Sequence, residues 1–226
     1  ESGVDSEMTS TLIRDFGAQL LRERRISMKR IDDAVRRILR VKFRAGLFEN
    51  PYAPYTPAEA EAQMLRPDAV AAANKAASRS MVLLRNEGGI LPLDPSKKTA
   101  VIGPLARNQH DMLGPWWGAG RDTDVVTVFE GINTQSSGAT YAEGCKLSNT
   151  EPPHTDPEGC GSDAGFAEAV AVARAADQVV LALGETREMS GEAAARSTLD
   201  LPGRQEELIA AIKATGKPYA VVLFNG

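Results

Sequence analysis

The stretch Gln178-Val-Val-Leu-Ala-Leu183 decides the fold of this chain. It is a short, continuous apolar run, as expected of a strand that is buried on both faces. Two similar runs, Thr99-Ala-Val-Ile-Gly103 and Tyr219-Ala-Val-Val-Leu-Phe224, lie before and after it. A helical pattern over residues 163–176 precedes the strand at 178–183, and another over residues 205–214 lies between that strand and the one at 219–224. Strands that alternate with helices predict an α/β fold with a mostly parallel sheet covered on both faces.

Upstream of this region the clearest helix covers residues 27–45, where apolar side chains return at steps of three and four residues. Ser27 is suited to cap the start of this helix, and Gly46 stands where a glycine commonly ends one. Residues 50–57 (NPYAPYTP) then break the pattern, because their prolines fix the backbone and remove hydrogen-bond donors. We interpret residues 50–66 as a linker between a first part, 1–49, and a second domain, 67–226.

The second domain is predicted to open with a helix that starts at Pro67 and runs to about Leu84. Its last strand, ending at Phe224, is followed by only two residues. The first residues, Glu1 to Asp5, have no features of a signal peptide. We therefore expect the chain to be cut at both ends and the second domain to be incomplete at its C-terminus.

Composition excludes several classes of protein. The chain has 226 residues, 42 % of them hydrophobic and 25 % charged, and a net charge of -4. We expect no nucleic-acid partner, which would need clustered Lys and Arg, and no membrane span, because no run approaches roughly 18 apolar residues. The two histidines, His110 and His154, have no Cys or carboxylate grouping around them, so we expect no metal site and no cofactor.

Cys145 and Cys160 lie in one loop rich in Pro, Gly, Asn and Asp. They are either two unrelated thiols or a local disulfide. We favour the disulfide, because this segment has few apolar residues to stabilise it and a bridge would offset that lack. A bridge implies an oxidising compartment such as the periplasm or the outside of the cell.

Ligands of open parallel sheets bind at the loops that follow the carboxyl ends of strands, which directs attention to residues 103–120 and 184–192. The first loop carries Trp116 and Trp117 between glycines. Either one of these indoles is buried as a wedge between domains, or they form a flat apolar platform for a ligand ring.

The second loop is unusually acidic for a segment that leaves a buried strand. Glu185, Glu188 and Glu192 all lie in it, with Arg187 and Arg196 near enough in sequence to pair with them. Such glutamates are often only members of surface ion pairs. The small residues around Glu192 nevertheless allow the backbone to approach another surface while the carboxyl group of Glu192 projects from it. Glu192 is therefore a candidate catalytic residue.

At this point the residues resemble a known family, glycoside hydrolase family 3, and within it the periplasmic β-glucosidases of Gram-negative bacteria. The similarity runs in order along the whole chain. The motifs that carry it in the second domain are Val82-Leu83-Leu84-Arg85-Asn86, Leu91-Pro92-Leu93, Ala100 to Ala106, Ser190-Gly191-Glu192-Ala193-Ala194-Ala195-Arg196, Leu199 to Gln205 and Ala214 to Pro218. Gly3-Val4-Asp5, residues 30–39 and Gly46-Leu47-Phe48 resemble the end of the (β/α)8 barrel of that family.

The resemblance implies part of a retaining, exo-acting β-glucosidase, periplasmic or secreted, that acts on β-glucosides or oligosaccharides and carries its general acid/base at Glu192. Retaining hydrolysis needs two carboxyl groups roughly 5 Å apart. The nucleophile of the family lies in a Ser/Thr-Asp-Trp motif, and this sequence has no Asp-Trp pair. We therefore expect the chain to be inactive alone and to need an upstream barrel segment, from the same or a partner chain.

An alternative function is a non-catalytic α/β module that binds a nucleotide or another small molecule. The loop from Gly184 to Gly191 could be taken for a phosphate loop. It lacks the Gly-Lys-Ser/Thr ending, however, and its glutamates would repel a phosphate.

Overall fold

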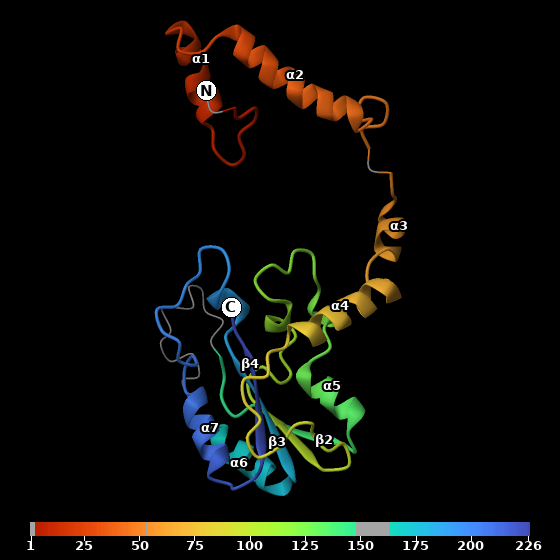
Figure 1. Ribbon diagram of the computed structural model, residues 1–226, viewed down its shortest axis with the longest axis vertical. Coiled ribbons are helices and arrows are strands. Elements are labelled where there is room, and N and C mark those ends of the chain that lie inside the picture. The colour runs from red at the N-terminus through yellow and green to blue at the C-terminus, as the bar shows by residue number, and fades with distance from the viewer. Residues whose placement is uncertain (1–2, 53, 148–162) are drawn as a thin grey trace. The chain divides into compact units, whose positions relative to one another are not determined.

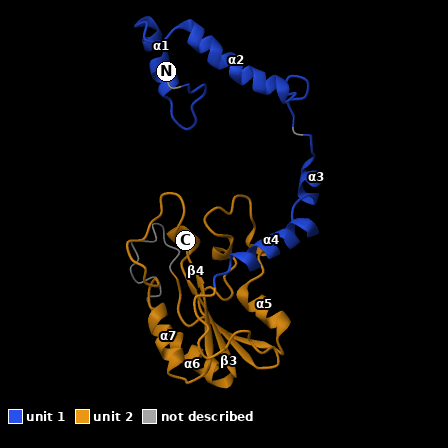
Figure 2. Cartoon of the chain, in the orientation of Figure 1, with its two compact units in different colours: residues 1–82 blue, residues 83–226 orange. Residues whose placement is uncertain are grey.

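The computed structural model describes residues 3–52, 54–147 and 163–226. The chain divides into two compact units, residues 1–82 and residues 83–226 (Figure 2). The predicted domain boundaries at residues 49 and 67 stay predictions, and the helix that begins at Pro67 groups with the first unit.

The second unit is built on a four-stranded sheet in the order β2-β1-β3-β4, with all neighbours parallel (Figure 1). Its strands are β1 (Thr99–Ile102), β2 (Ala139–Ala142), β3 (Gln178–Gly184) and β4 (Tyr219–Phe224). This sheet confirms the predicted parallel α/β fold. β2 escaped prediction because it has only four residues and includes polar Thr140, so it carries little of the apolar signal of a buried strand.

Helices cover both faces of this sheet, as its continuously apolar central strands require. On one face Ile102, Leu181 and Leu183 pack with residues of α6 and α7. On the other face Val101 and Ala182 pack with Phe129 of α5. The helices are α5 (Val128–Gln135), α6 (Phe166–Ala175) and α7 (Gln205–Lys213).

The strand order reverses between β1 and β3, because β1 connects outward to β2 while β3 connects outward to β4. Such a switch point brings the loops after the two central strands side by side, where open α/β sheets bind ligands. Two glycines keep this junction close. A Cβ on Gly103 would lie 2.2 Å from the Ala182 carbonyl oxygen, and one on Gly184 would lie 1.9 Å from the Phe224 carbonyl oxygen.

The first unit consists of helices and loops in its described residues. Ser27 accepts a hydrogen bond from the Arg30 amide at the start of the second helix, and Gly46 has a φ of 70° after its end, as predicted. The helix at Pro67 ends at Ser80, earlier than Leu84. The helices are α1 (Leu12–Arg22), α2 (Met28–Arg44), α3 (Pro57–Ala62) and α4 (Pro67–Ser80).

Residues 57–62 of the predicted linker form the short helix α3, which the sequence analysis missed. Pro57 stands at the first position of this helix, where its missing amide is not needed, and the side chains of Thr56 and Glu59 form a capping box that starts the helix. Over the described part of the chain, no helix combines the length and apolarity needed to cross a bilayer.

The close approach at Gly184 leads to a test of the sheet. Gly184→Ala should lower the free energy of unfolding by about 3 kcal/mol or more, because the residue has a φ of 141° and the new methyl group would overlap the β4 backbone. Urea unfolding followed by circular dichroism measures this change.

Gly131→Ala is the matched control. Gly131 lies inside α5 with nothing within 4 Å of an added Cβ, so this substitution should stabilise the protein by about 0.5–1 kcal/mol. Equal stability of the two variants would show that β3 and β4 tolerate a wider separation than described.

Candidate functional site

The two loops at the switch point contain short helical turns. The loop after β1 contains the 3₁₀ turns η1 (Asp111–Leu113) and η2 (Asp122–Asp124). The loop after β3 contains η4 (Arg187–Met189) and continues through Glu192 to α7. Residues of η1 lie against residues of η4, so the predicted ligand-binding loops meet in the structure.

A buried carboxylate joins the two loops. Asp111 is 7 % exposed, and its Oδ1 accepts a hydrogen bond from the Arg187 amide at 3.0 Å. The Asn108 side-chain amide donates to its other oxygen. Burial raises the pKa of the Asp111 carboxyl, although the bond from the Arg187 amide favours its ionised form. Asp111 was not predicted from the sequence, because one aspartate in a glycine-rich loop has no pattern that indicates burial.

Glu188 is held in an ionic cluster. Its Oε1 lies 2.8 Å from Arg187 Nε and 3.5 Å from His110 Nε2. The other nitrogen of His110 lies 3.2 Å from Asp122 Oδ2. Partial burial, the largest single effect, opposes ionisation of Glu188, but the hydrogen bond from Arg187, a backbone hydrogen bond and the nearby positive charges together lower the pKa of the carboxyl. Glu188 is therefore an ionised, paired group with no proton to donate near neutral pH.

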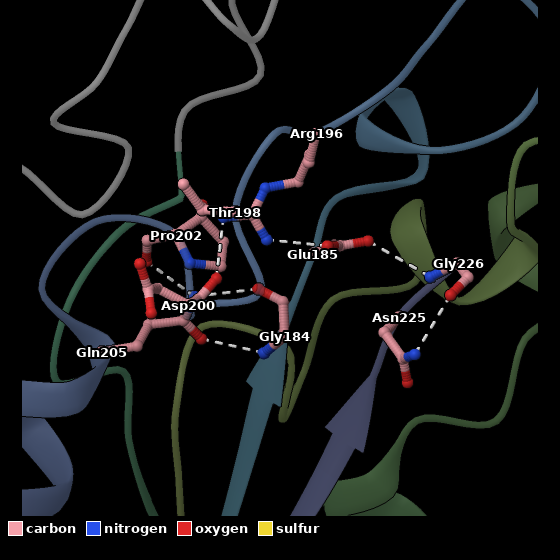
Figure 3. Close-up of polar contacts among 9 residues, drawn as sticks. All are labelled: Gly184, Glu185, Arg196, Thr198, Asp200, Pro202, Gln205, Asn225 and Gly226. Carbon is pink, nitrogen blue, oxygen red and sulfur yellow. Dashed lines mark hydrogen bonds and ion pairs between the residues drawn. The ribbon is translucent and has the colours of Figure 1, made fainter.

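Glu185 is engaged in a second ion pair, drawn in Figure 3. Its Oε1 lies 2.7 Å from Arg196 Nη1, and its Oε2 accepts a hydrogen bond of 3.1 Å from the Gly226 amide. Arg196 also donates to the Asp200 carbonyl oxygen at 2.7 Å. Both charged side chains of this pair are mostly buried, so the pair belongs to the framework of the loop.

Glu192 differs from both of these glutamates. It is exposed, and within the described part of the chain its carboxylate has no hydrogen bond or ion pair. Gly191 and Ala193 on either side have φ values of 101° and 60°, in the left-handed region. A Cβ on Gly191 would lie 2.6 Å from Pro115 Cβ, so this glycine allows the two loops to touch. The arrangement leaves the Glu192 carboxyl available to a ligand.

The adjacent tryptophans are both exposed in this chain, Trp116 at 73 % and Trp117 at 45 %. The Arg187 guanidinium lies 4.8 Å from the centre of the Trp117 ring, within the range of a cation–π contact. One face of Trp117 is thereby occupied by a residue of the acidic loop. The predicted role of the two rings as a platform for a ligand stays a prediction.

Gln205 fixes the base of the acidic loop and was not singled out from the sequence. It is completely buried at the start of α7. Its side chain accepts a hydrogen bond from the Gly184 amide and donates to the carbonyl oxygens of Gly184 and Pro202 (Figure 3). A buried glutamine that satisfies backbone groups at a strand end holds that end in one place. The only sequence signal was its place in the motif that ends Gly203-Arg204-Gln205.

The expected bridge between Cys145 and Cys160 stays a prediction. Cys145 is buried, while Cys160 lies outside the described residues, as does His154. In the part of the chain that the structure covers, no three His, Cys, Asp or Glu side chains come together as a metal ion would require.

The chain is similar to known proteins of one family. Residues 81–226 match the family described as the glycosyl hydrolase family 3 C-terminal domain. The whole chain aligns with a periplasmic beta-glucosidase from Salmonella typhimurium at 37 % identity, and the alignment covers 32 % of that protein. A beta-xylosidase from Formosa agariphila aligns with 88 % of the chain at 35 % identity, and the alignment covers 27 % of that protein. The chain therefore spans about a third of the length of these curated relatives or less.

A solved structure shares the fold. The crystal structure of a beta-glucosidase from Listeria innocua in complex with gluconolactone matches 99 % of this chain with a TM-score of 0.83. The sequences are 32 % identical, and the match covers 29 % of the Listeria chain.

The link between the two loops can be tested through Asp111. Asp111→Ala should lower the free energy of unfolding by about 1–3 kcal/mol, because the Arg187 amide and the Asn108 side chain lose a buried acceptor. Urea unfolding at neutral pH measures this. Asp124→Ala removes a surface pair with Arg121 and should cost less than about 1 kcal/mol. Equal effects would mean that Asp111 does not join the loops.

Proposed function

This chain belongs to glycosyl hydrolase family 3, and we propose that it is part of a retaining, exo-acting β-glucosidase in which Glu192 is the general acid/base. The observation that carries the proposal is the contrast among the three loop glutamates. Glu185 and Glu188 are held in ion pairs, whereas Glu192 is exposed beside the Trp-containing loop.

Retaining hydrolysis makes two demands on the acid/base. In the first step it must carry a proton that it gives to the oxygen of the leaving group while a second carboxylate attacks the anomeric carbon. In the second step the same residue, now ionised, takes a proton from the water that releases the sugar. Glu192 suits this cycle, because no arginine or backbone amide of the described residues binds its carboxylate, which is exposed to an approaching substrate.

The nucleophile is proposed to come from residues outside 1–226. The sequence has no Asp-Trp pair, and the matched relatives are about three times as long as the part that this chain covers. In this proposal residues 1–49 complete the barrel that carries the nucleophile, and the upstream segment comes from the same or a partner chain. Residues 1–226 alone should then have no turnover, and no cofactor takes part.

The proposed substrates are β-glucosides or oligosaccharides with a terminal, non-reducing β-glucosyl residue. The similarity over the whole chain to a periplasmic beta-glucosidase supports glucose over xylose, although a named beta-xylosidase is almost as similar. The exposed Trp116 and Trp117 provide apolar surface for a sugar ring. The name of the first relative and the predicted disulfide support a periplasmic or secreted location.

The acid/base role of Glu192 can be tested in the intact enzyme that contains this chain. Glu192→Ala should lower kcat/KM for alkyl β-glucosides by about 10²–10⁴-fold, and far less for dinitrophenyl β-glucoside, whose leaving group needs no proton. Azide should restore turnover of the activated substrate, because the small anion can occupy the emptied space and attack the glycosyl intermediate without base help.

Glu206→Ala is the control, since Glu206 is an exposed carboxylate on α7, away from the loop. It should behave as the unchanged enzyme does on both substrates. If Glu188→Ala or Glu185→Ala gave the leaving-group dependence and Glu192→Ala did not, the acid/base would be assigned to the wrong residue of the loop.

A further inference from the structure

We propose that the ion pair between Glu185 and Arg196 positions Glu192 by closing the loop that carries it. This inference rests on the proposed acid/base role of Glu192. Neither charged residue of the pair is assigned to the reaction itself, and Arg196 acts through the backbone of the loop. The loop between the pair, residues 185–196, is called the acid loop below.

The first half of the acid loop is fixed by the fold. The Glu185 amide donates to the Phe224 carbonyl oxygen of β4 at 2.9 Å, and Gln205 holds the preceding Gly184. The Arg187 amide is bound to the buried carboxylate of Asp111. Residues 184–189 are therefore anchored to the sheet and to the neighbouring loop up to a point shortly before Glu192.

The second half has no comparable attachment. Among the described residues, a single backbone hydrogen bond spans its tip, from the Ala194 amide to the Gly191 carbonyl oxygen, and at 3.4 Å it is long for a hydrogen bond. Residues 193–195 are alanines, whose side chains cannot form hydrogen bonds. Arg196 is thus the first residue after Glu192 whose side chain can bind the chain elsewhere.

Arg196 makes this attachment in two directions (Figure 3). One nitrogen of its guanidinium binds the Glu185 carboxylate at the start of the acid loop, and the other donates to the Asp200 carbonyl oxygen beyond its end. The planar guanidinium presents several donors in a fixed geometry, which suits a group that must orient three segments. The side chains are only 21 % and 17 % exposed, so water screens this pair less than a surface pair.

The geometry at the tip makes this closure necessary. Ala193 has a φ of 60°, a conformation that costs a residue other than glycine free energy and persists only where its surroundings enforce it. With the loop ends joined by Arg196, the chain must turn back within a few residues, which enforces that conformation. Without the pair, Ala193 would relax to an ordinary backbone region and the Glu192 carboxyl would move.

The experiment is a double-mutant cycle in the intact enzyme, with kcat/KM measured on an alkyl β-glucoside and on dinitrophenyl β-glucoside. Arg196→Ala should reduce the alkyl glucoside value by about 10–100-fold, since a misplacement of about 1 Å costs as much, and the activated value by less than threefold. In the background of Glu192→Ala, Arg196→Ala should have no further effect on the alkyl substrate, because two residues that act as one unit are not additive.

Two further variants separate positioning from folding. Glu185→Gln keeps the acceptor oxygen but removes the charge, so it should give a smaller loss with the same dependence on the leaving group. Arg204→Ala removes another arginine of the same unit, which pairs with Glu207 and Asp163 outside the acid loop, and should change neither substrate selectively. Amide hydrogen exchange over residues 191–195 should speed up in Arg196→Ala and stay unchanged in Arg204→Ala.

Each outcome decides a distinct point. Equal loss on both substrates, independent losses in the double variant, or unchanged exchange over residues 191–195 would overturn the positioning role and leave Glu192 as the acid/base. If Glu192→Ala itself had no leaving-group dependence, the proposed function would be overturned and the positioning role with it.

Discussion

The parallel pairing of β3 with both β1 and β4 is the constraint on which the second unit depends. β3 is buried along its whole length, so every backbone group of the strand needs a partner in the sheet. Gly103 and Gly184 allow the neighbouring backbones to approach at its carboxyl end. The connections after β1 and β3 run toward opposite edges of the sheet, so this pairing also fixes where the two functional loops begin.

The carboxylates of the two loops have two different roles: three of them stabilise the loop structure, and one is left exposed to a ligand. Asp111, Glu185 and Glu188 each bind a backbone amide or an arginine in the described structure, and these bonds shape the loops. Glu192 follows a glycine at the tip and has no such bond among the described residues. A carboxylate bound to a fixed partner is not free to contact a ligand, whereas a general acid/base must lie within hydrogen-bonding reach of the reacting group. The same loop thus contains both kinds of glutamate at positions set by the fold.

The sequence predicted the features that arise from local pattern. Continuous apolar runs located β1, β3 and β4, and helical spacing located α2, α6 and α7. It missed β2 and α5, whose short segments carry a weaker pattern, and α3, which prolines obscured. Asp111 and Gln205 were missed for another reason. Their importance comes from burial beside residues 76 and 21 positions away in the chain, and no local pattern reports such contacts.

The contact between Gly191 and Pro115 has a consequence for recombination between relatives. Pro115 occupies the space that any larger residue at position 191 would need, so the tips of the two loops are complementary in shape. A chimera that combines Pro115 from this chain with a larger residue at position 191 from another parent would meet a steric clash, even if each segment folded well in its own parent. The two tips should therefore be exchanged together when segments of this domain are swapped between relatives.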